Sequence, residues 1–185
     1  MKKGGIQDKK TSTNSSKNFF LDAEKLELDR ENSVFNNAVS LVNETRQNIF
    51  ITGKAGTGKT TLAKIIAGNV DADLMYINAS DENNVETVRT KVKNFASTIG
   101  FKRWKIVILD EADYMTNIAQ CALRRIIEKY SNNVRFCIIC NHINKIIPAI
   151  RSRCMVFNFL PINKIHITKK IFDISKCENF IIDNE

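Results

Sequence analysis

Apolar residues recur along the chain with two different spacings, which alternate between about residues 33 and 159. Short apolar runs are typical of buried strands, and apolar residues three or four positions apart are typical of amphipathic helices. The runs predict strands at 48–52, 73–78, 105–109, 134–140 and 154–159. The helical spacing predicts helices over about 33–45, 59–68, 83–98, 117–130 and 144–150. This alternation indicates an α/β fold with a five-stranded, mostly parallel sheet and helices on both faces.

The two ends of the chain differ from this alternating region. The first 18 residues have almost nothing to bury, which predicts a disordered tail. Pro161 ends the alternation, and after it Ile167, Ile171 and Ile174 share one helical face. The sequence therefore predicts three parts, a disordered tail over 1–18, a core domain over 19–160 and the start of a further helical element over 161–185.

Length, charge and cysteine content narrow the class of protein. The 185 residues are enough for one α/β domain with a sizeable core, and the net charge of +8 suggests an anionic partner. No apolar run approaches the roughly 20 residues of a membrane span, and the N-terminal lysines precede no signal-peptide core. We therefore expect an intracellular protein that is not secreted and has no membrane partner. Cys137 and Cys140 lie in an apolar run, which favours buried thiols over a zinc site.

A glycine-rich stretch, "ITGKAGTGKTT", joins the first predicted strand to a predicted helix. It fits the phosphate-binding pattern in which Gly53 is followed by four residues and then by Gly58, Lys59 and Thr60. In such a loop the backbone N–H groups and the lysine hold phosphates, and the Thr60 hydroxyl is a ligand for Mg²⁺. The predicted nucleotide-binding residues are Gly53, Lys54, Ala55, Gly56, Thr57, Gly58, Lys59, Thr60 and Thr61.

Two acidic residues follow the predicted strand 105–109, in the stretch "KIVILDEAD". Asp110 lies at the carboxyl end of this strand, where it can hold the Mg²⁺ shell together with Thr60. Glu111 is then placed to orient or deprotonate the attacking water, which predicts a hydrolase rather than a phosphate-binding module.

Polar residues also flank the last predicted strands. Asn141 follows strand 134–140, where it could bond the γ-phosphate or the attacking water, or simply terminate the strand. The stretch "RSRC" places two arginines before the final strand. Arg153 could stabilise transition-state charge, within the chain or in a neighbour, or could form a surface ion pair. On the residues alone, these alternatives remain open.

Basic side chains are concentrated on two predicted helices and near them. The range 87–109 contains six basic residues and no acidic one. Arg89 and Lys93 lie four residues apart on the polar side of one helix, and Arg124 and Arg125 lie on another. Such groups suit nucleic-acid phosphates, although a solvated face is the simpler interpretation. No aromatic residues are interleaved, so base stacking is not indicated.

Three long stretches resemble a known family. "INASDENNVETVRTKVKNFAST", "KIVILDEADYMTNIAQCALRRIIEKYSNNVRFCIICN" and "KIIPAIRSRC" are similar to the small ATPase subunits of sliding-clamp loaders. This group covers replication factor C of eukaryotes and archaea and the related loader subunit of T4-like phages. The resemblance, over roughly 70–160, implies an AAA+ P-loop core whose helical lid is only begun. It also implies a ring-like oligomer that binds ATP and Mg²⁺, opens a clamp and threads primer–template DNA.

The resemblance also implies roles for individual residues. Lys59 and Thr60 match Walker A, Asp110 and Glu111 match Walker B, Asn141 matches sensor 1, and Arg153 matches the finger that reaches a neighbouring subunit's ATP. Arg89 and Lys93 match the helix that tracks the DNA backbone. Arg124, on the predicted helix 117–130, remains a further DNA-binding candidate from its residue type and position. The implied partners are other loader subunits, the sliding clamp and primer–template DNA, in the nucleus of a eukaryote or the cytoplasm of a prokaryote or phage-infected cell.

The region before the phosphate-binding loop departs from this family. It has no counterpart of the family's "KYRP" segment, and Ala55 stands where loaders usually have proline. The stretch "FNNAVSLVNETRQNIFITGKAGTGKTT" instead resembles helicase-type P-loop proteins. One alternative is therefore a helicase, which needs a second motor domain and an S-A-T-like motif that we do not find in the sequence. Another is a nucleotide-binding assembly module that depends on partner subunits for hydrolysis.

Overall fold

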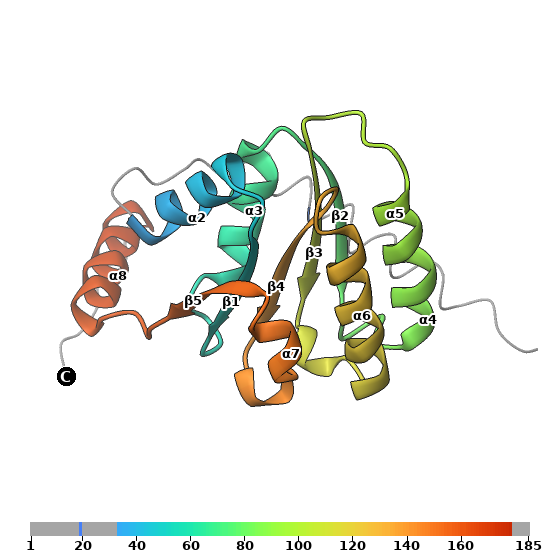
Figure 1. Ribbon diagram of the computed structural model, residues 1–185. Coiled ribbons are helices and arrows are strands. Elements are labelled where there is room, and N and C mark those ends of the chain that lie inside the picture. Colours follow the sequence, from blue (N-terminus) through green and yellow to red (C-terminus); the bar gives the residue numbers. More distant parts are fainter. Residues whose placement is uncertain (1–18, 20–32, 179–185) are drawn as a thin grey trace, which may run out of the picture.

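A computed structural model of the chain describes Phe19 and residues 33–178 (Figure 1). The predicted disordered tail, residues 1–18, lies outside the described residues. The strands are β1 (Asn48–Gly53), β2 (Ala72–Asn78), β3 (Trp104–Asp110), β4 (Arg135–Cys140) and β5 (Cys154–Phe159). They form one sheet in the order β2-β3-β4-β1-β5. Every neighbouring pair is parallel, so the prediction of five strands is confirmed and the sheet is wholly rather than mostly parallel.

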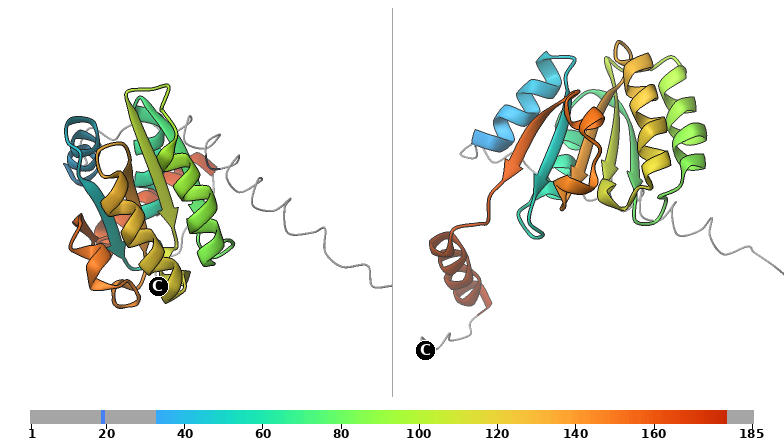
Figure 2. Two further views of the ribbon diagram at one scale, coloured as in Figure 1. Left: turned by 45° about the vertical axis from the view of Figure 1, so that its right-hand side comes forward. Right: turned by 60° about the horizontal axis from the view of Figure 1, so that its bottom comes forward.

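Helices cover both faces of this sheet (Figure 2). Helices α2 (Ser33–Glu44) and α3 (Lys59–Asn69) pack on one face, where Ile106 and Ile108 of β3 point. The other face, where Val107 and Leu109 point, is covered by α4 (Val85–Thr87), η1 (Val88–Val92), α5 (Lys93–Ser97), α6 (Asn117–Tyr130) and α7 (Pro148–Arg151). Successive strand residues point to opposite faces, so a continuous apolar run serves both cores.

Two predicted helices are built from shorter pieces. The helix predicted over 83–98 is continuous from α4 to α5, but its middle, η1, is one turn of π-helix. Its start is capped by Asn84, whose side chain accepts a hydrogen bond from the Thr87 N–H. Val88 and Val92, four residues apart, are buried, as the apolar face of an amphipathic helix requires. The helix predicted over 144–150 is instead the 3₁₀ turn η3 (Ile143–Lys145) followed by α7. A separate 3₁₀ turn, η2 (Ala112–Tyr114), follows β3.

The last described element, α8 (Lys164–Glu178), stands apart from the sheet (Figures 1 and 2). Its predicted apolar residues Ile167, Ile171 and Ile174 are 43–46% exposed. A helix therefore begins where the sequence predicted one, and its role as the start of a lid stays a prediction. None of the described helices is long and apolar enough to cross a membrane.

Candidate active site

A cavity of ≈ 380 Å³ lies where the loop after β1 meets the carboxyl ends of β3 and β4. In open parallel sheets, ligands bind outside these ends of the strands. The cavity is lined by Ala55, Gly56, Gly58, Lys59, Thr60, Thr61, Asp110, Glu111, Ile139, Cys140 and Asn141. The fold therefore brings together the two motifs and the strand-end asparagine that the sequence had singled out.

The glycines of the loop let its backbone curl above the sheet. Gly58, directly before α3, has φ 92°, a left-handed conformation that glycine adopts without steric cost. The following N–H groups thus point from the start of α3 toward the cavity, where the helix carries its partial positive charge. Gly53 has a different role, because a Cβ there would lie 2.3 Å from the Phe159 carbonyl oxygen of β5. Gly53 therefore fixes the close approach of the loop to β5.

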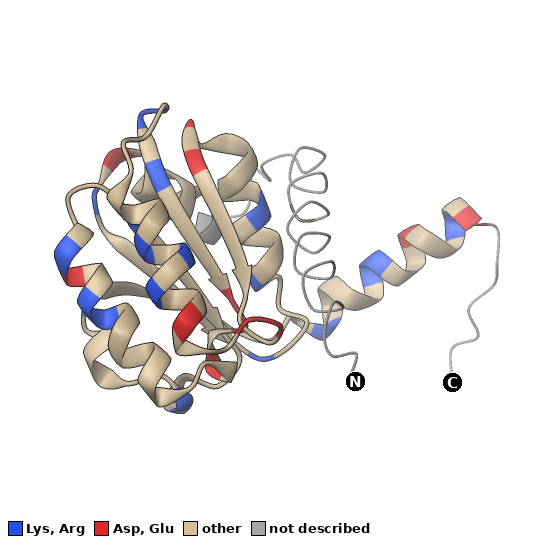
Figure 3. Cartoon of the chain, turned by 90° about the vertical axis from the view of Figure 1, so that its right-hand side faces the viewer, with Lys and Arg blue, Asp and Glu red and all other residues tan. Residues whose placement is uncertain are grey.

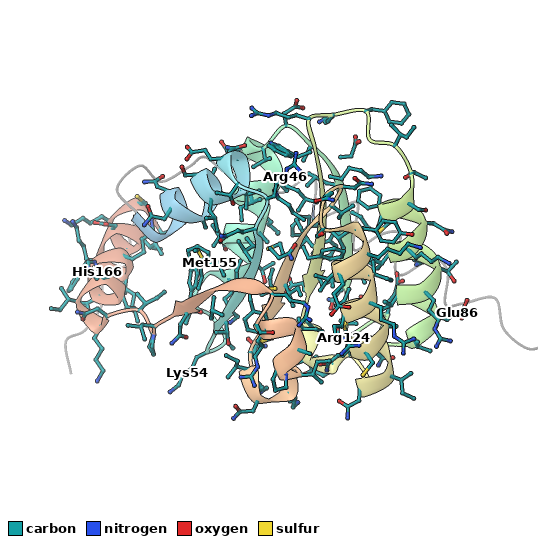
Figure 4. All side chains as sticks on the ribbon, in the orientation of Figure 1. Arg46, Lys54, Glu86, Arg124, Met155 and His166 are labelled. Atoms are coloured by element: carbon teal, nitrogen blue, oxygen red, sulfur yellow. The ribbon has the colours of Figure 1, made fainter. Side chains whose placement is uncertain are left out.

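Lys59 is only 7% exposed, and its ammonium group lies within the loop. Its Nζ donates to the carbonyl oxygens of Gly53, at 2.9 Å, and Lys54, at 2.6 Å. Burial lowers the pKa of Lys59, while Cys140 and two nearby aspartates act in the opposite direction. Lys54 itself projects away from the loop (Figure 4). The loop carbonyls thus hold one cation at the wall of the cavity, as phosphate binding requires.

Asp110 is 5% exposed and is the most fully hydrogen-bonded carboxylate of the site. Thr60 Oγ1 donates to its Oδ2 at 3.0 Å, and the Tyr76 hydroxyl donates to the same oxygen at 3.3 Å. The Glu111 N–H donates to Oδ1 at 2.9 Å. Burial raises the pKa of Asp110, and these three hydrogen bonds act against that rise. The carboxylate is therefore held in one orientation beside the Thr60 hydroxyl.

The donors present fit Mg²⁺ shared with a phosphate rather than a metal held by protein alone. No group of three or more His, Cys, Asp or Glu side chains that could hold a metal ion occurs within Phe19 and residues 33–178. Mg²⁺ is commonly bound by one or two carboxylates together with substrate phosphates and water. Here Asp110 would supply the carboxylate, and the Thr60 hydroxyl beside it would be a further oxygen ligand. When bound, the ion would neutralise charge on the phosphates.

Glu111 and Asn141 reach the same cavity from adjacent strands, β3 and β4. Glu111 has φ 52° and is the one non-glycine residue with positive φ in the described part of the chain. Residues other than glycine seldom adopt this left-handed backbone conformation, and those that do are concentrated at functional sites. The Asn141 N–H donates to Oδ1 of buried Asp113 at 3.3 Å, which fixes the end of β4. A carboxylate and an amide thus face the space beyond the loop.

Arg153 lies at the opposite end of the sheet from this cavity, just before the amino end of β5. Its guanidinium contacts Glu128 Oε1 of α6, 2.7 Å from Nη2, and donates from Nη1 to the Ala149 carbonyl oxygen at 2.6 Å. Its own carbonyl oxygen accepts a 3.2 Å bond from Nδ2 of buried Asn48. The structure therefore does not bring Arg153 to the phosphate-binding loop of its own chain.

The basic residues gather at a second hollow, of ≈ 290 Å³, between the α4–α5 helix and α6. It is lined by Arg89, Lys93, Ile118, Cys121, Ala122, Arg125 and Ile126, which we call the basic groove. Lys and Arg positions recur along these helices in Figure 3. Arg124 does not line the groove: its Nε lies 3.8 Å from Glu128 Oε1, and Figure 4 labels it on α6. Two of the three predicted DNA-binding residues, Arg89 and Lys93, therefore line the basic groove, and Arg125 lines it as well.

A sequence model of the ATPase family associated with various cellular activities (AAA) matches residues 49–162. The chain belongs to the AAA family. The match covers β1 from its second residue, the other four strands, both motifs and Arg153. Family membership confirms the predicted P-loop ATPase core.

Relatives of this AAA domain include replication proteins. Replication factor C subunit 3 of Schizosaccharomyces pombe is 51% identical over 138 residues, 71% of this chain and 40% of the relative. The replication factor C small subunit of Methanococcus maripaludis is 41% identical over 143 residues, 74% of this chain and 45% of the relative. The sequence resemblance to this group is thus confirmed. The chain spans less than half the length of these two relatives.

Solved structures support the fold alone, because their sequences are distant. A DNA polymerase III gamma subunit-related protein of Thermotoga maritima superposes with a TM-score of 0.64 at 17% identity, covering 78% of this chain and 52% of its own. A single-substitution variant of RuvB from the same organism gives a TM-score of 0.60 at 15% identity, covering 92% of this chain and 52% of its own. Both alignments agree with the AAA assignment.

Three residues near the site of this AAA domain were not predicted from the sequence. Tyr76 bonds Asp110, while Ile139 and Cys140 line the cavity. The cysteine had been placed only as a core thiol, and burial does raise its pKa. A signal for Tyr76 existed, because it lies two residues before the end of the strand that pairs with β3. The order of the strands determines that β2 is the neighbour of β3, and the motifs alone do not give this order.

Proposed function

We propose that this chain is an ATP-hydrolysing subunit of a DNA sliding-clamp loader, which opens the clamp and places it on primer–template DNA during replication. It would work inside the cell with other loader subunits, in the nucleus if the host is eukaryotic. The observation that carries the proposal is the separation of Arg153 from Lys59, Thr60, Asp110 and Glu111 at opposite ends of one sheet. Arg153, as the proposed finger, is therefore available to the ATP site of a neighbouring chain and not to its own.

The chemistry follows from the residues of the cavity. The loop N–H groups and Lys59 bind and orient the phosphates, and Thr60 with Asp110 would hold Mg²⁺, which neutralises phosphate charge when bound. Glu111 accepts a proton from the attacking water, and Asn141 orients that water or the terminal phosphate. A guanidinium from the next subunit stabilises the charge that develops on the transferred phosphoryl group. The basic groove contacts DNA phosphates, which suits a protein that holds DNA regardless of sequence.

The proposal is tested by ATP hydrolysis of the chain with its loader partners, with and without primer–template DNA and a sliding clamp. We expect stimulation that requires both the clamp and the primed DNA. Turnover driven by single-stranded nucleic acid alone, together with strand separation, would contradict a loader and indicate a helicase. Turnover that appears only when partner subunits are added, without any response to DNA or clamp, would indicate an assembly module.

Substitutions in the basic groove should weaken DNA binding without regard to sequence. We expect Arg89→Ala, Lys93→Ala and Arg125→Ala each to reduce affinity about three- to tenfold at about 0.1 M salt, because each removes one phosphate contact. Each should also reduce the slope of log K against log salt by about one. Arg124→Ala should have a smaller effect, because this side chain faces Glu128. Fluorescence anisotropy with primed DNA over a salt series measures both quantities.

Lys129→Ala is the matched control, because Lys129 is an exposed cation of the same helix that does not line the groove. Its salt slope should equal that of the wild type. Equal losses for Lys129→Ala and Arg125→Ala would show that net charge, and not the groove, determines DNA binding.

A further inference from the structure

Tyr76 lies beside the metal side of the ATP site, although it belongs to neither motif. In the pairing of β2 with β3, Tyr76 is opposite Ile108 and Asn78 is opposite Asp110. Tyr76 and Asp110 therefore share one face of the sheet at diagonal positions, a separation that a long side chain bridges. The Tyr76 hydroxyl does so, donating to Asp110 Oδ2 at 3.3 Å.

The Tyr76 ring is held in place independently of the nucleotide. It stacks on the ring of Phe19, with centroids 3.9 Å apart and planes 17° apart. Phe19 is itself only 3% exposed and packs against the core on the α2–α3 face of the sheet. An ionised carboxylate can only accept hydrogen bonds, so the Tyr76 hydroxyl is the donor of this pair.

The other two donors to Asp110 have further tasks. Thr60, which shares Oδ2, is also the hydroxyl expected beside Mg²⁺, and the Glu111 N–H belongs to the residue expected to accept the water proton. Tyr76 contacts the carboxylate from a third element, β2, and does not line the cavity. Its hydroxyl is therefore a donor to Asp110 that remains available while Thr60 serves the metal.

We propose that Tyr76 is a positioning residue that holds the Asp110 carboxylate in the orientation that Mg²⁺ requires. The Mg²⁺-dependent part of nucleotide affinity then depends on the Tyr76 hydroxyl, whereas binding of the phosphates by the loop does not. This inference rests on the proposed role of Thr60 and Asp110 as the Mg²⁺ side of the site.

Tyr76→Phe tests this role, because it removes the hydroxyl and keeps the ring stacked on Phe19. Binding of a fluorescent ATP analogue is measured in EDTA and over a Mg²⁺ titration. We expect affinity in EDTA within about twofold of the wild type, and a half-saturating Mg²⁺ concentration raised about three- to tenfold, the effect of losing one hydrogen bond of ordinary net strength. Tyr130→Phe, at the end of α6 away from the site, should leave both unchanged.

The possible results distinguish the role of Tyr76 from the proposed Mg²⁺ role of Thr60 and Asp110. An unchanged Mg²⁺ midpoint in Tyr76→Phe, with a normal Mg²⁺ response in the wild type, would overturn the role of Tyr76. If Tyr76→Phe lowers nucleotide affinity equally in EDTA and in Mg²⁺ and also lowers the unfolding temperature, Tyr76 contributes to packing. That result would also overturn its positioning role. A wild-type protein whose nucleotide affinity ignores Mg²⁺ would overturn the metal assignment itself, and with it the role of Tyr76.

Discussion

Glu111→Gln should stop ATP hydrolysis while leaving ATP binding nearly unchanged. The amide has the shape of the carboxylate but cannot accept a proton from water, and a general base contributes about 10²–10⁴-fold to rate. Glu111 belongs to the cavity lining, whereas Asp110 and Lys59, which would bind metal and phosphate, keep their own hydrogen bonds. We therefore expect kcat to fall by about 10²–10⁴ in the assembled complex and the ATP dissociation constant to change by less than about threefold.

Phosphate release in the stimulated complex measures kcat, and equilibrium binding of a fluorescent ATP analogue measures affinity. Glu44→Gln is the matched control, since its carboxylate lies at the end of α2, next to the start of β1, and accepts a local bond from Ser40. Its kcat should equal that of the wild type. Hydrolysis by Glu111→Gln within about threefold of wild type would show that another group activates the water.

Most of the fold could be predicted because its signals are local. The apolar runs that become β3 and β4 are buried on both faces, so they stand out in the sequence without any knowledge of their neighbours. The carboxyl ends of parallel strands meet at one edge, which is why Asp110 and Asn141 were expected beside the loop that ends in Lys59. A glycine-rich loop between a strand and a helix has few other uses.

The choice between Arg124 and Arg125 could not be made from the sequence. Adjacent helical residues point about 100° apart, and which of them faces α4–α5 depends on how α6 is rotated. That rotation is set by burial of Leu123, Ile126 and Ile127, and it turns Arg125 to the groove and Arg124 toward Glu128. The one-turn π-helix in the facing helix was likewise not predicted, because the apolar spacing does not distinguish it from a regular helix.

Removal of the Arg153 guanidinium should stop hydrolysis in the neighbouring subunit and not in its own. The guanidinium lies at the end of the sheet opposite the cavity, and its contact with Glu128 is 38–40% exposed. An exposed ion pair of this kind is worth at most about 1 kcal/mol, so a neighbour's phosphates can displace it. Loss of a finger supplied in trans costs about 10³–10⁵ in kcat. We expect Arg153→Ala to lose this activity, and Arg153→Lys to restore little of it, because lysine lacks the planar fork.

Mixing two inactive variants distinguishes a finger supplied in trans from one that acts within the chain. Where copies of this chain are neighbours, an Arg153→Ala subunit still has Glu111, and a Glu111→Gln subunit still has Arg153. A site is complete where an Arg153→Ala subunit binds the ATP and a Glu111→Gln subunit supplies the arginine. In a head-to-tail interface, about a quarter of the neighbouring pairs in an equal mixture have this order. The mixture should therefore recover about a quarter of wild-type turnover. A finger acting in cis gives no recovery, because each chain then lacks one essential group. No recovery from an oligomer shown to contain both variants would therefore remove the basis for a shared site, and the separation of Arg153 from its own cavity would need another explanation.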